Sequence, residues 1–290
     1  MANGAPRRPL RPWRRFARGA VAALCLWAAA PVANACSPQH PSKGVPGRAA
    51  EMVFSNRAGL GRHETWAPRD AELVMHAAYA GLTDEYGHGI LGPLRDTKAL
   101  TIHIYARGSD RITCPAEAVL PAGEVFEDIA PRLADLDGDG MPEVIVVHST
   151  TSQGARLAIY DRRARVIAAT PHIGRRNRWL APIGAADLDG DGMIEIAYID
   201  RPHLAKTLRV WRFQNGRLID LAQAGGLTNH KIGWDFISGG IRDCGQGPEM
   251  ITADAGWSRI MASKLRAGRI VSRALGPFDP QAIQKAMRCF

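Results

Sequence analysis

Two short segments of the sequence carry the acidic side chains that a hard cation would need. Residues 135–143 read DLDGDGMPE and residues 187–195 read DLDGDGMIE. Each places three aspartates at alternate positions and ends on a glutamate. Carboxylates gathered so closely repel one another unless a cation neutralises them, and a set of oxygen ligands favours calcium over magnesium, which requires stricter octahedral geometry. The sequence therefore predicts two calcium sites.

The predicted ligands are the same in both loops. An EF-hand opens with this spacing, but it needs a glutamate at its twelfth position, where the chain has Val146, and a helix on each side. Here each loop runs into a segment of β character, and the glutamate at the ninth position closes the site. A tight Asp-Gly turn would explain a glycine but not three alternating aspartates, twice. We expect the ligands to be Asp135, Asp137, Asp139, Met141 and Glu143, and Asp187, Asp189, Asp191, Met193 and Glu195, each methionine through its carbonyl.

The loops mark a repeating unit, because the second begins 52 residues after the first (187 − 135 = 52). Asn215-Gly216 between two alternating apolar segments is a strong hairpin signal. Around the second loop we expect strands at 180–186, 194–200, 207–213 and 217–221. The same plan predicts strands at 129–134, 143–148, 156–160 and 166–170, and again at 236–241, 250–253, 259–264 and 269–272. A fainter unit contains residues 81–92 followed by a strand at 99–106.

Four-stranded antiparallel units of this length predict an all-β fold, a β-propeller with four or five blades. A two-sheet sandwich is the alternative, but it does not explain the internal repeat. In the third unit the loop at 243–249 keeps Glu249 and has lost the alternating acids, so no metal is expected there. We expect a signal segment (1–35), an N-terminal segment that contributes to a closing blade (36–72), the repeats (73–275) and a C-terminal tail (276–290) with a short helix near 280–287.

The N-terminal 35 residues have the features of a secretory signal. Six arginines and no acid precede the apolar run 19–30, which is too short to span a bilayer. Ala33-Asn34-Ala35 predicts cleavage before Cys36, and the missing leucine upstream argues against a lipid anchor on that cysteine. Cleavage lowers the net charge from +9 to +3 (9 − 6 = +3), which removes the argument for a nucleic-acid partner. We expect a periplasmic or secreted monomer with no transmembrane segment.

Four cysteines remain after the signal: Cys36, Cys114, Cys244 and Cys289. An even number in an exported chain favours disulfides, and three pairings are possible. A bridge between Cys36 and Cys289 would tie the two termini together and would suit a closed ring.

The acid loop that runs into a strand, repeated at this spacing, resembles the FG-GAP/VCBS repeat family, whose best-known relative is the integrin α-chain propeller. The resemblance covers roughly residues 73–275, with specific motifs at 135–143 and 187–195. It implies that each loop joins the first and second strands of a blade and binds calcium. The family pattern coincides with the ten ligands named above. Calcium in such loops is expected to stabilise the fold rather than to take part in catalysis.

Strand order in such blades would place a second functional surface at the end away from the acid loops. The loops between second and third strands and the links between blades emerge there, and they combine cations with Trp and His. Such residues could hold an acidic glycan or a protein through charge and stacking. Solvated arginines and tryptophans packed between blades are the alternative. The candidates are Arg178, Trp179, His203, His230 and Trp257; His88 is expected to be a hydrogen-bonded turn residue.

No G-x-S-x-G, H-E-x-x-H or P-loop motif occurs in the sequence. We therefore predict a non-enzymatic, calcium-binding exported module that binds a protein or glycan partner. One alternative is a polysaccharide-active, lyase-like enzyme, with His203 or His230 as the base and Arg178 binding the sugar carboxylate. The other is a purely structural envelope protein.

Overall fold

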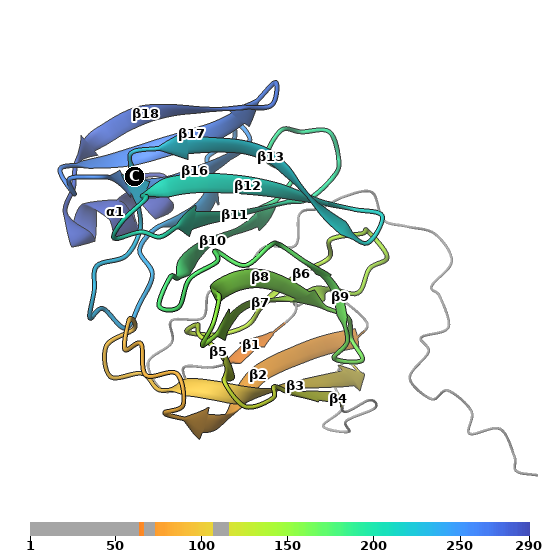
Figure 1. The fold of residues 1–290 in the computed structure, drawn as a ribbon. Coiled ribbons are helices and arrows are strands. Elements are labelled where there is room, and N and C mark those ends of the chain that lie inside the picture. Colours follow the sequence, from red (N-terminus) through yellow and green to blue (C-terminus); the bar gives the residue numbers. More distant parts are fainter. Residues whose placement is uncertain (1–63, 67–72, 107–115) are drawn as a thin grey trace, which may run out of the picture. The chain divides into compact units, whose positions relative to one another are not determined.

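The computed structural model in Figure 1 describes residues 64–66, 73–106 and 116–290. The chain divides into two units, residues 1–35 and 36–290, and every described residue belongs to the second. Within the described residues there are eighteen strands and one short helix. The predicted signal segment, Cys36 and Cys114 lie outside them. None of the described helices is long and apolar enough to cross a membrane.

The repeat around the second acid loop forms one four-stranded antiparallel sheet, as predicted. Neighbouring strands follow the order of the sequence, and Asn215 and Gly216 both have positive φ (51° and 69°), which is the backbone of a two-residue hairpin turn. A β-bulge at Pro182/Gly184 interrupts the first pairing. The strands are β10 (Leu180–Ala186), β11 (Glu195–Asp200), β12 (Thr207–Gln214) and β13 (Arg217–Gly225).

The repeat around the first acid loop has the same four strands but belongs to a larger sheet. It comprises β6 (Arg132–Ala134), β7 (Glu143–Thr150), β8 (Gly154–Tyr160) and β9 (Val166–Ala169). The short strand β5 (Glu124–Phe126) pairs with β7 and, through the single pair Thr97↔Phe126, with β3. This bridge joins the repeat to the preceding strands in one nine-stranded sheet, a continuity that the repeat pattern did not predict. Those strands are β1 (Glu64–Trp66), β2 (Leu73–Thr83), β3 (Asp96–Ala106) and β4 (Ala116–Val119).

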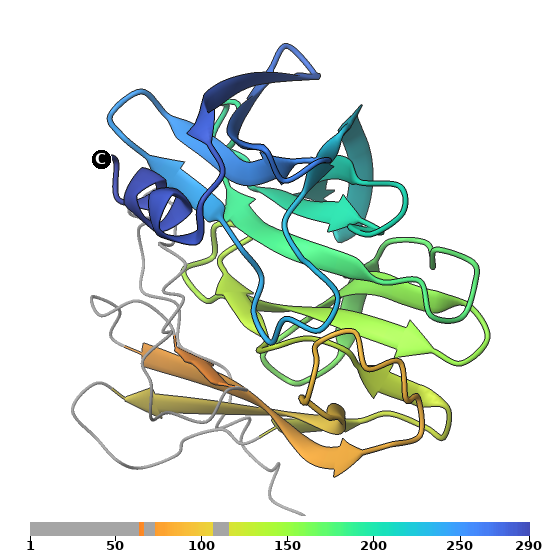
Figure 2. The same cartoon turned by 90° about the vertical axis from the view of Figure 1, so that its left-hand side faces the viewer.

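The third repeat forms the last sheet and carries the helix. Its strands are β15 (Gly240–Asp243), β16 (Pro248–Asp254), β17 (Arg259–Arg266) and β18 (Arg269–Pro277), and β14 (Leu227–Thr228) pairs with the end of β16. Helix α1 (Pro280–Met287) begins after Asp279, whose side chain accepts hydrogen bonds from the Gln281 and Ala282 N–H groups. Ile283 and Ala286 pack against this sheet, where Figure 2 shows the helix beside the blue strands. The predicted strands and helix are present, but the first strand is shorter than predicted in the first repeat (β6 instead of 129–134) and begins later in the third (β15 instead of 236–241).

The sheets pack face to face through continuous apolar clusters. One cluster combines Ile145 and Leu157 of the first repeat with Leu180 and Ile196 of the second. Another combines residues of the second and third repeats: Ile183, Ile199, Leu208, Met250 and Leu265. Strands β10 and β11 are buried along their whole length because they have a neighbouring sheet on each face. The fold is therefore all-β and propeller-like, in agreement with the prediction.

The described disulfide differs from the predicted clasp between the termini. Cys289 is bonded to Cys244, with the two Cα atoms 5.6 Å apart. The partner of Cys289 is thus in the loop of its own repeat and not Cys36, because α1 carries the C-terminal end of the chain back to that loop. The Cys36–Cys289 alternative was wrong.

Candidate metal centres

The first loop (residues 135–143) is folded by its own carboxylates. Asp135 accepts hydrogen bonds from the Gly138 N–H (2.8 Å) and the Gly140 N–H (3.0 Å). Gly138 and Gly140 have φ of 77° and 86°, a region that glycine adopts without strain. Glu143, the first residue of β7, accepts a hydrogen bond from the Leu136 N–H at 2.8 Å. The glycines and acids therefore fix a closed loop between β6 and β7.

The second loop (residues 187–195) repeats these bonds almost atom for atom. Asp187 accepts from the Gly190 N–H (2.7 Å) and the Gly192 N–H (2.9 Å). Glu195 accepts from the Leu188 N–H at 2.8 Å. Two loops in different sheets share one hydrogen-bond pattern, so their conformation follows from their own sequence.

In both loops three of the predicted ligands come together. The groups are Asp135, Asp137 and Glu143, and Asp187, Asp189 and Glu195; within each, the ligand atoms lie within 4.8 Å of one another. Two oxygens bound to one calcium ion at 2.3–2.6 Å lie at most about 4.6–5.2 Å apart. One cation can therefore contact all three carboxylates, and the donor set of oxygens alone suits calcium.

The other predicted ligands are not in these groups of three. Asp139 accepts a hydrogen bond from the Met141 N–H, and Asp191 accepts one from the Met193 N–H. These aspartates and the carbonyls of the two methionines stay predictions as ligands.

The first loop has little positive charge to balance its acids. Burial raises the pKa of Glu143 to about 8, and Asp137, Asp139 and Asp135 add to the shift. Burial also raises the pKa values of Asp135 and Asp137. Arg162 is 3.6 Å from Asp139 and opposes the rise in the pKa of Asp137, but its effect is smaller than that of burial. A bound cation would relieve this repulsion, since it would stabilise the ionised carboxylates.

A cationic side chain from a neighbouring strand, Arg212 of β12, already contacts the second loop. The register of β11 and β12 places Arg212 opposite Glu195. Its guanidinium contacts Glu195 Oε1 at 2.7 Å, Asp189 Oδ2 at 2.9 Å and Asp191 Oδ2 at 2.7 Å. Burial still raises the pKa of Glu195, to about 7. Sequence reasoning missed Arg212, and only the strand register could have identified it.

The third loop (residues 243–249) forms no such acid group among the described residues. Its closing Glu249 instead contacts three cations: Arg242 at 2.9 Å, Arg273 at 2.9 Å and Lys264 at 3.8 Å. Although burial opposes the change, hydrogen bonds from Arg242 and Arg273 lower the pKa of Glu249. The glutamate is thus balanced by protein cations.

The residues predicted to bind a glycan or protein, at the end of the strands away from the acid loops, differ in solvent accessibility. Trp179 is 2% exposed, and its indole N–H donates to the Glu127 carbonyl. His230 is fully buried, with one ring nitrogen 3.1 Å from His203 and the other 2.9 Å from the Trp234 carbonyl. Both therefore lie beneath the surface. Arg178, His203 and Trp257 are partly exposed.

An aromatic cluster that sequence reasoning did not define surrounds Trp257. Trp234 stacks on Phe236 with ring centroids 4.5 Å apart, and Trp257 meets Trp234 edge-on at 5.2 Å. The Lys231 ammonium lies 4.8 Å from the Trp257 ring and 5.4 Å from the Trp234 ring. Trp257 itself has a positive φ of 57° in the β16–β17 turn. We call Lys231, Trp234, Phe236 and Trp257 the aromatic cluster.

His88 is held as a turn residue, the role expected for it. Its Nδ1 lies 2.5 Å from Glu127 Oε1, and the Ser149 hydroxyl donates to the other oxygen of Glu127. Glu127 is 1% exposed, and burial raises its pKa. No metal-binding group containing His88 occurs in the part of the chain that the structure describes.

The comparisons with known proteins agree with this geometry. A comparison with curated proteins finds no match to the chain. Residues 135–198, from the first loop into β11, match the family of the FG-GAP-like repeat. The matched segment contains both acid loops and their hydrogen-bonded carboxylates. Residues 135–198 are therefore similar to an FG-GAP-like repeat.

Proposed function

We propose that this chain is an exported, non-enzymatic module that binds calcium in its two acid loops and an acidic glycan at the opposite ends of its strands. The observation that carries the proposal is the separation of two chemistries. The acid loops join the first and second strands of their repeats. The aromatic cluster lies on the link before β15 and on the β16–β17 turn, at the other end of the strands.

Calcium would stabilise the fold in this proposal. Each loop closes a connection between two strands, and its carboxylates repel one another in the absence of a cation. At a free calcium concentration twentyfold above Kd, one site adds roughly 1.8 kcal/mol to the free energy of unfolding. A full domain is stable by only about 5–15 kcal/mol. The comparison of melting temperatures with calcium and with a chelator tests this part, and equal temperatures would contradict it.

The aromatic cluster supports the glycan part of the proposal. Trp234, Phe236 and Trp257 are partly exposed, so sugar rings could stack on them. Lys231 is exposed beside these rings and could pair with the carboxylate of a uronic acid. Arg178 and His203 of the predicted ligand face are also partly exposed.

Titration of the protein with uronic-acid oligosaccharides, followed by tryptophan fluorescence and calorimetry, tests the glycan part. We expect saturable binding that Trp257→Ala reduces at least about tenfold, equivalent to about 1.4 kcal/mol, because the variant removes a ring on which a sugar could stack. Ile232→Ala is the matched control: Ile232 is 71% exposed on the same link but has no ring. Equal effects of the two variants would contradict a role for stacking. Binding to a protein partner alone would favour the other candidate ligand.

The surroundings of the two candidate bases support the lyase alternative less well than the glycan-binding proposal. Both ring nitrogens of His230 are engaged, and burial lowers its pKa to about 4. Burial also lowers the pKa of His203, whose Nε2 faces His230. Incubation with uronic-acid polymers separates the two functions, since a lyase would produce new double bonds that absorb ultraviolet light.

A further inference from the structure

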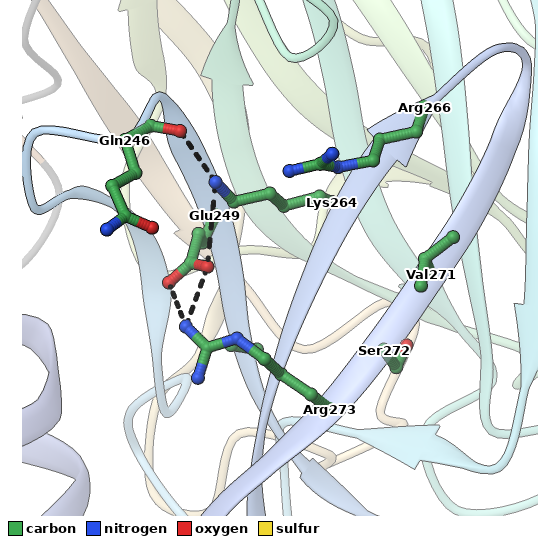
Figure 3. Close-up of a pocket in the computed structure, with 8 residues that line it drawn as sticks. Gln246, Glu249, Lys264, Arg266, Val271, Ser272 and Arg273 are labelled. Carbon is green, nitrogen blue, oxygen red and sulfur yellow. Dashed lines mark hydrogen bonds and ion pairs between the residues drawn. The ribbon is translucent and has the colours of Figure 1, made fainter.

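A pocket of about 280 Å³ lies beside the third loop, where the first two repeats have their acid clusters. Figure 3 shows Glu249 between Lys264 and Arg273. Arg266, the last residue of β17, also lines the pocket. Lys264 and Arg266 alternate along β17, and β18 places Arg273 opposite Ala262 on the same face. The outer hairpin therefore presents three cations to one pocket.

The charge in this pocket is not balanced by its single acid. Arg242, which does not line the pocket, already binds Glu249 with two hydrogen bonds (3.2 and 2.9 Å) and is anchored to the Ala286 carbonyl. The positive charge of Arg242 thus neutralises the negative charge of Glu249. Lys264, Arg266 and Arg273 line the pocket and give it a net positive charge.

Arg266 is the free cation of the group. Its side chain is exposed and has no hydrogen bond or ion pair with any residue in the described part of the chain. Lys264 donates to the Gln246 carbonyl at 2.6 Å, which fixes its ammonium at the rim of the loop. Arg273 is 59% exposed although it contacts Glu249, so part of its guanidinium can bind another acceptor.

The third loop is also held in place without a metal. Cys244 in this loop is bonded to Cys289, and Arg242 joins Glu249 to the end of α1. The pocket therefore lies beside a covalently fixed loop.

We propose that this pocket binds a tetrahedral oxyanion, the sulfate or phosphate group of a small molecule or of a glycan. Guanidinium groups offer paired donors that match oxyanion geometry, and a lysine adds a point charge. The loop between the first two strands would therefore bind a cation in the first two repeats, whereas the pocket beside the equivalent loop of the third repeat would bind an anion. This site is at the loop end of the strands and is independent of the aromatic cluster.

Amide NMR spectra of the full chain, recorded during titration with inorganic sulfate and inorganic phosphate, test the proposal. Both titrations are run without calcium, so that calcium salts cannot form and the acid loops cannot supply a bridging cation. Sodium chloride keeps the ionic strength constant. We expect saturable shifts confined to the third loop and the β17–β18 hairpin. A sulfated and a phosphorylated monosaccharide then show which source of the oxyanion binds more tightly.

Two arginine variants separate a specific site from general surface charge. Arg266→Gln should weaken oxyanion binding about fivefold or more, because the variant loses a charge-assisted hydrogen bond that salt only partly screens. Arg217→Gln is the control, because Arg217 is exposed at the equivalent turn of the second repeat and the change in net charge is the same. Arg217→Gln should leave the affinity unchanged. The proposal is overturned if neither oxyanion gives saturable shifts, or if both variants weaken binding equally.

Discussion

The first and third loops occupy equivalent places in their repeats, yet they balance their closing glutamate in opposite ways. Glu143 is surrounded by other carboxylates, and burial raises its pKa to about 8. Glu249 is surrounded by arginines and a lysine, and its pKa is lowered. The residue paired with the glutamate across the sheet is Ala134 in the first repeat and Arg242 in the third. The same backbone position can thus be surrounded by acids or by cations of the protein.

The second loop is intermediate between these two. It keeps every acid of the first loop, but Arg212 contacts three of its carboxylates. We therefore expect the two acid loops to bind calcium with different affinities, although their sequences are almost identical. The difference comes from the neighbouring strand and not from the loop.

The largest predicted effect comes from the covalent closure of the third loop. Replacing Cys244 and Cys289 with alanine should lower the free energy of unfolding by roughly 4 kcal/mol, the chain-entropy estimate for the separation of 45 residues. The difference in stability between this variant and the unchanged chain should be the same with and without calcium, because the third loop has no acid cluster. Denaturant unfolding of both proteins in the two conditions measures the difference. A smaller difference in calcium would contradict the separation of covalent and ionic closure.

A smaller effect is expected from the first acid loop. Asp135→Asn removes a ligand and should abolish the calcium-dependent stabilisation of this loop, roughly 1.8 kcal/mol at twentyfold excess over Kd. For a domain of this size that corresponds to about 4–7 °C in melting temperature, at about 2–4 °C per kcal/mol. Asp187→Asn is the matched variant in the second loop, and its effect should be smaller because Arg212 already balances that loop. A larger effect of Asp187→Asn would reverse the ranking.

Removal of Arg212 should make the second loop resemble the first. Arg212→Gln should raise calcium affinity at the second loop by about tenfold, equivalent to about 1.4 kcal/mol. Without calcium the same variant should be less stable, because three carboxylates lose their ion-pair partner. Calcium titration and thermal unfolding give the two values. Arg209→Gln, on the same strand but paired with Asp200 and Asp220, is the control. If affinity is unchanged in R212Q, the guanidinium does not compete with the ion.

A pH dependence of the calcium-free protein is also expected. Glu143 has a pKa of about 8 when folded against an ordinary value of 4.5, so the folded state holds a proton that the unfolded state has lost. Stability without calcium should therefore fall as the pH rises from about 4.5 to about 8. Urea unfolding at several pH values measures the slope. Glu143→Gln should reduce it, and an unchanged slope would assign it to other groups.

Local features of this fold could be predicted from the sequence, because they depend on neighbouring residues. The acid loops, the Asn215-Gly216 hairpin and α1 all lie where the pattern places them. Their signals are the loop glycines, alternating apolar residues and the Asp279-Pro280 start of the helix. Non-local pairings could not be predicted in the same way. The bridge through Thr97↔Phe126 joins two repeats by a single residue pair, which leaves no pattern in the sequence.

The candidate site shows the same division. The three-carboxylate groups were predicted from spacing within nine residues. Arg212 and the partner of Cys289 were not, since each is brought to its loop by a strand or helix distant in sequence. Trp179 and His230 were predicted at a ligand face, but both are buried between sheets, because residue type alone does not tell which side of a link faces solvent.

Calorimetric titration of the calcium-free chain with calcium tests whether the two acid loops are metal centres. We expect two bound ions per chain with unequal affinities, the tighter one lost in Asp135→Asn and the weaker one in Asp187→Asn. Binding of no calcium would contradict the assignment of the acid loops as metal centres. Two sites of equal affinity would contradict the role given to Arg212.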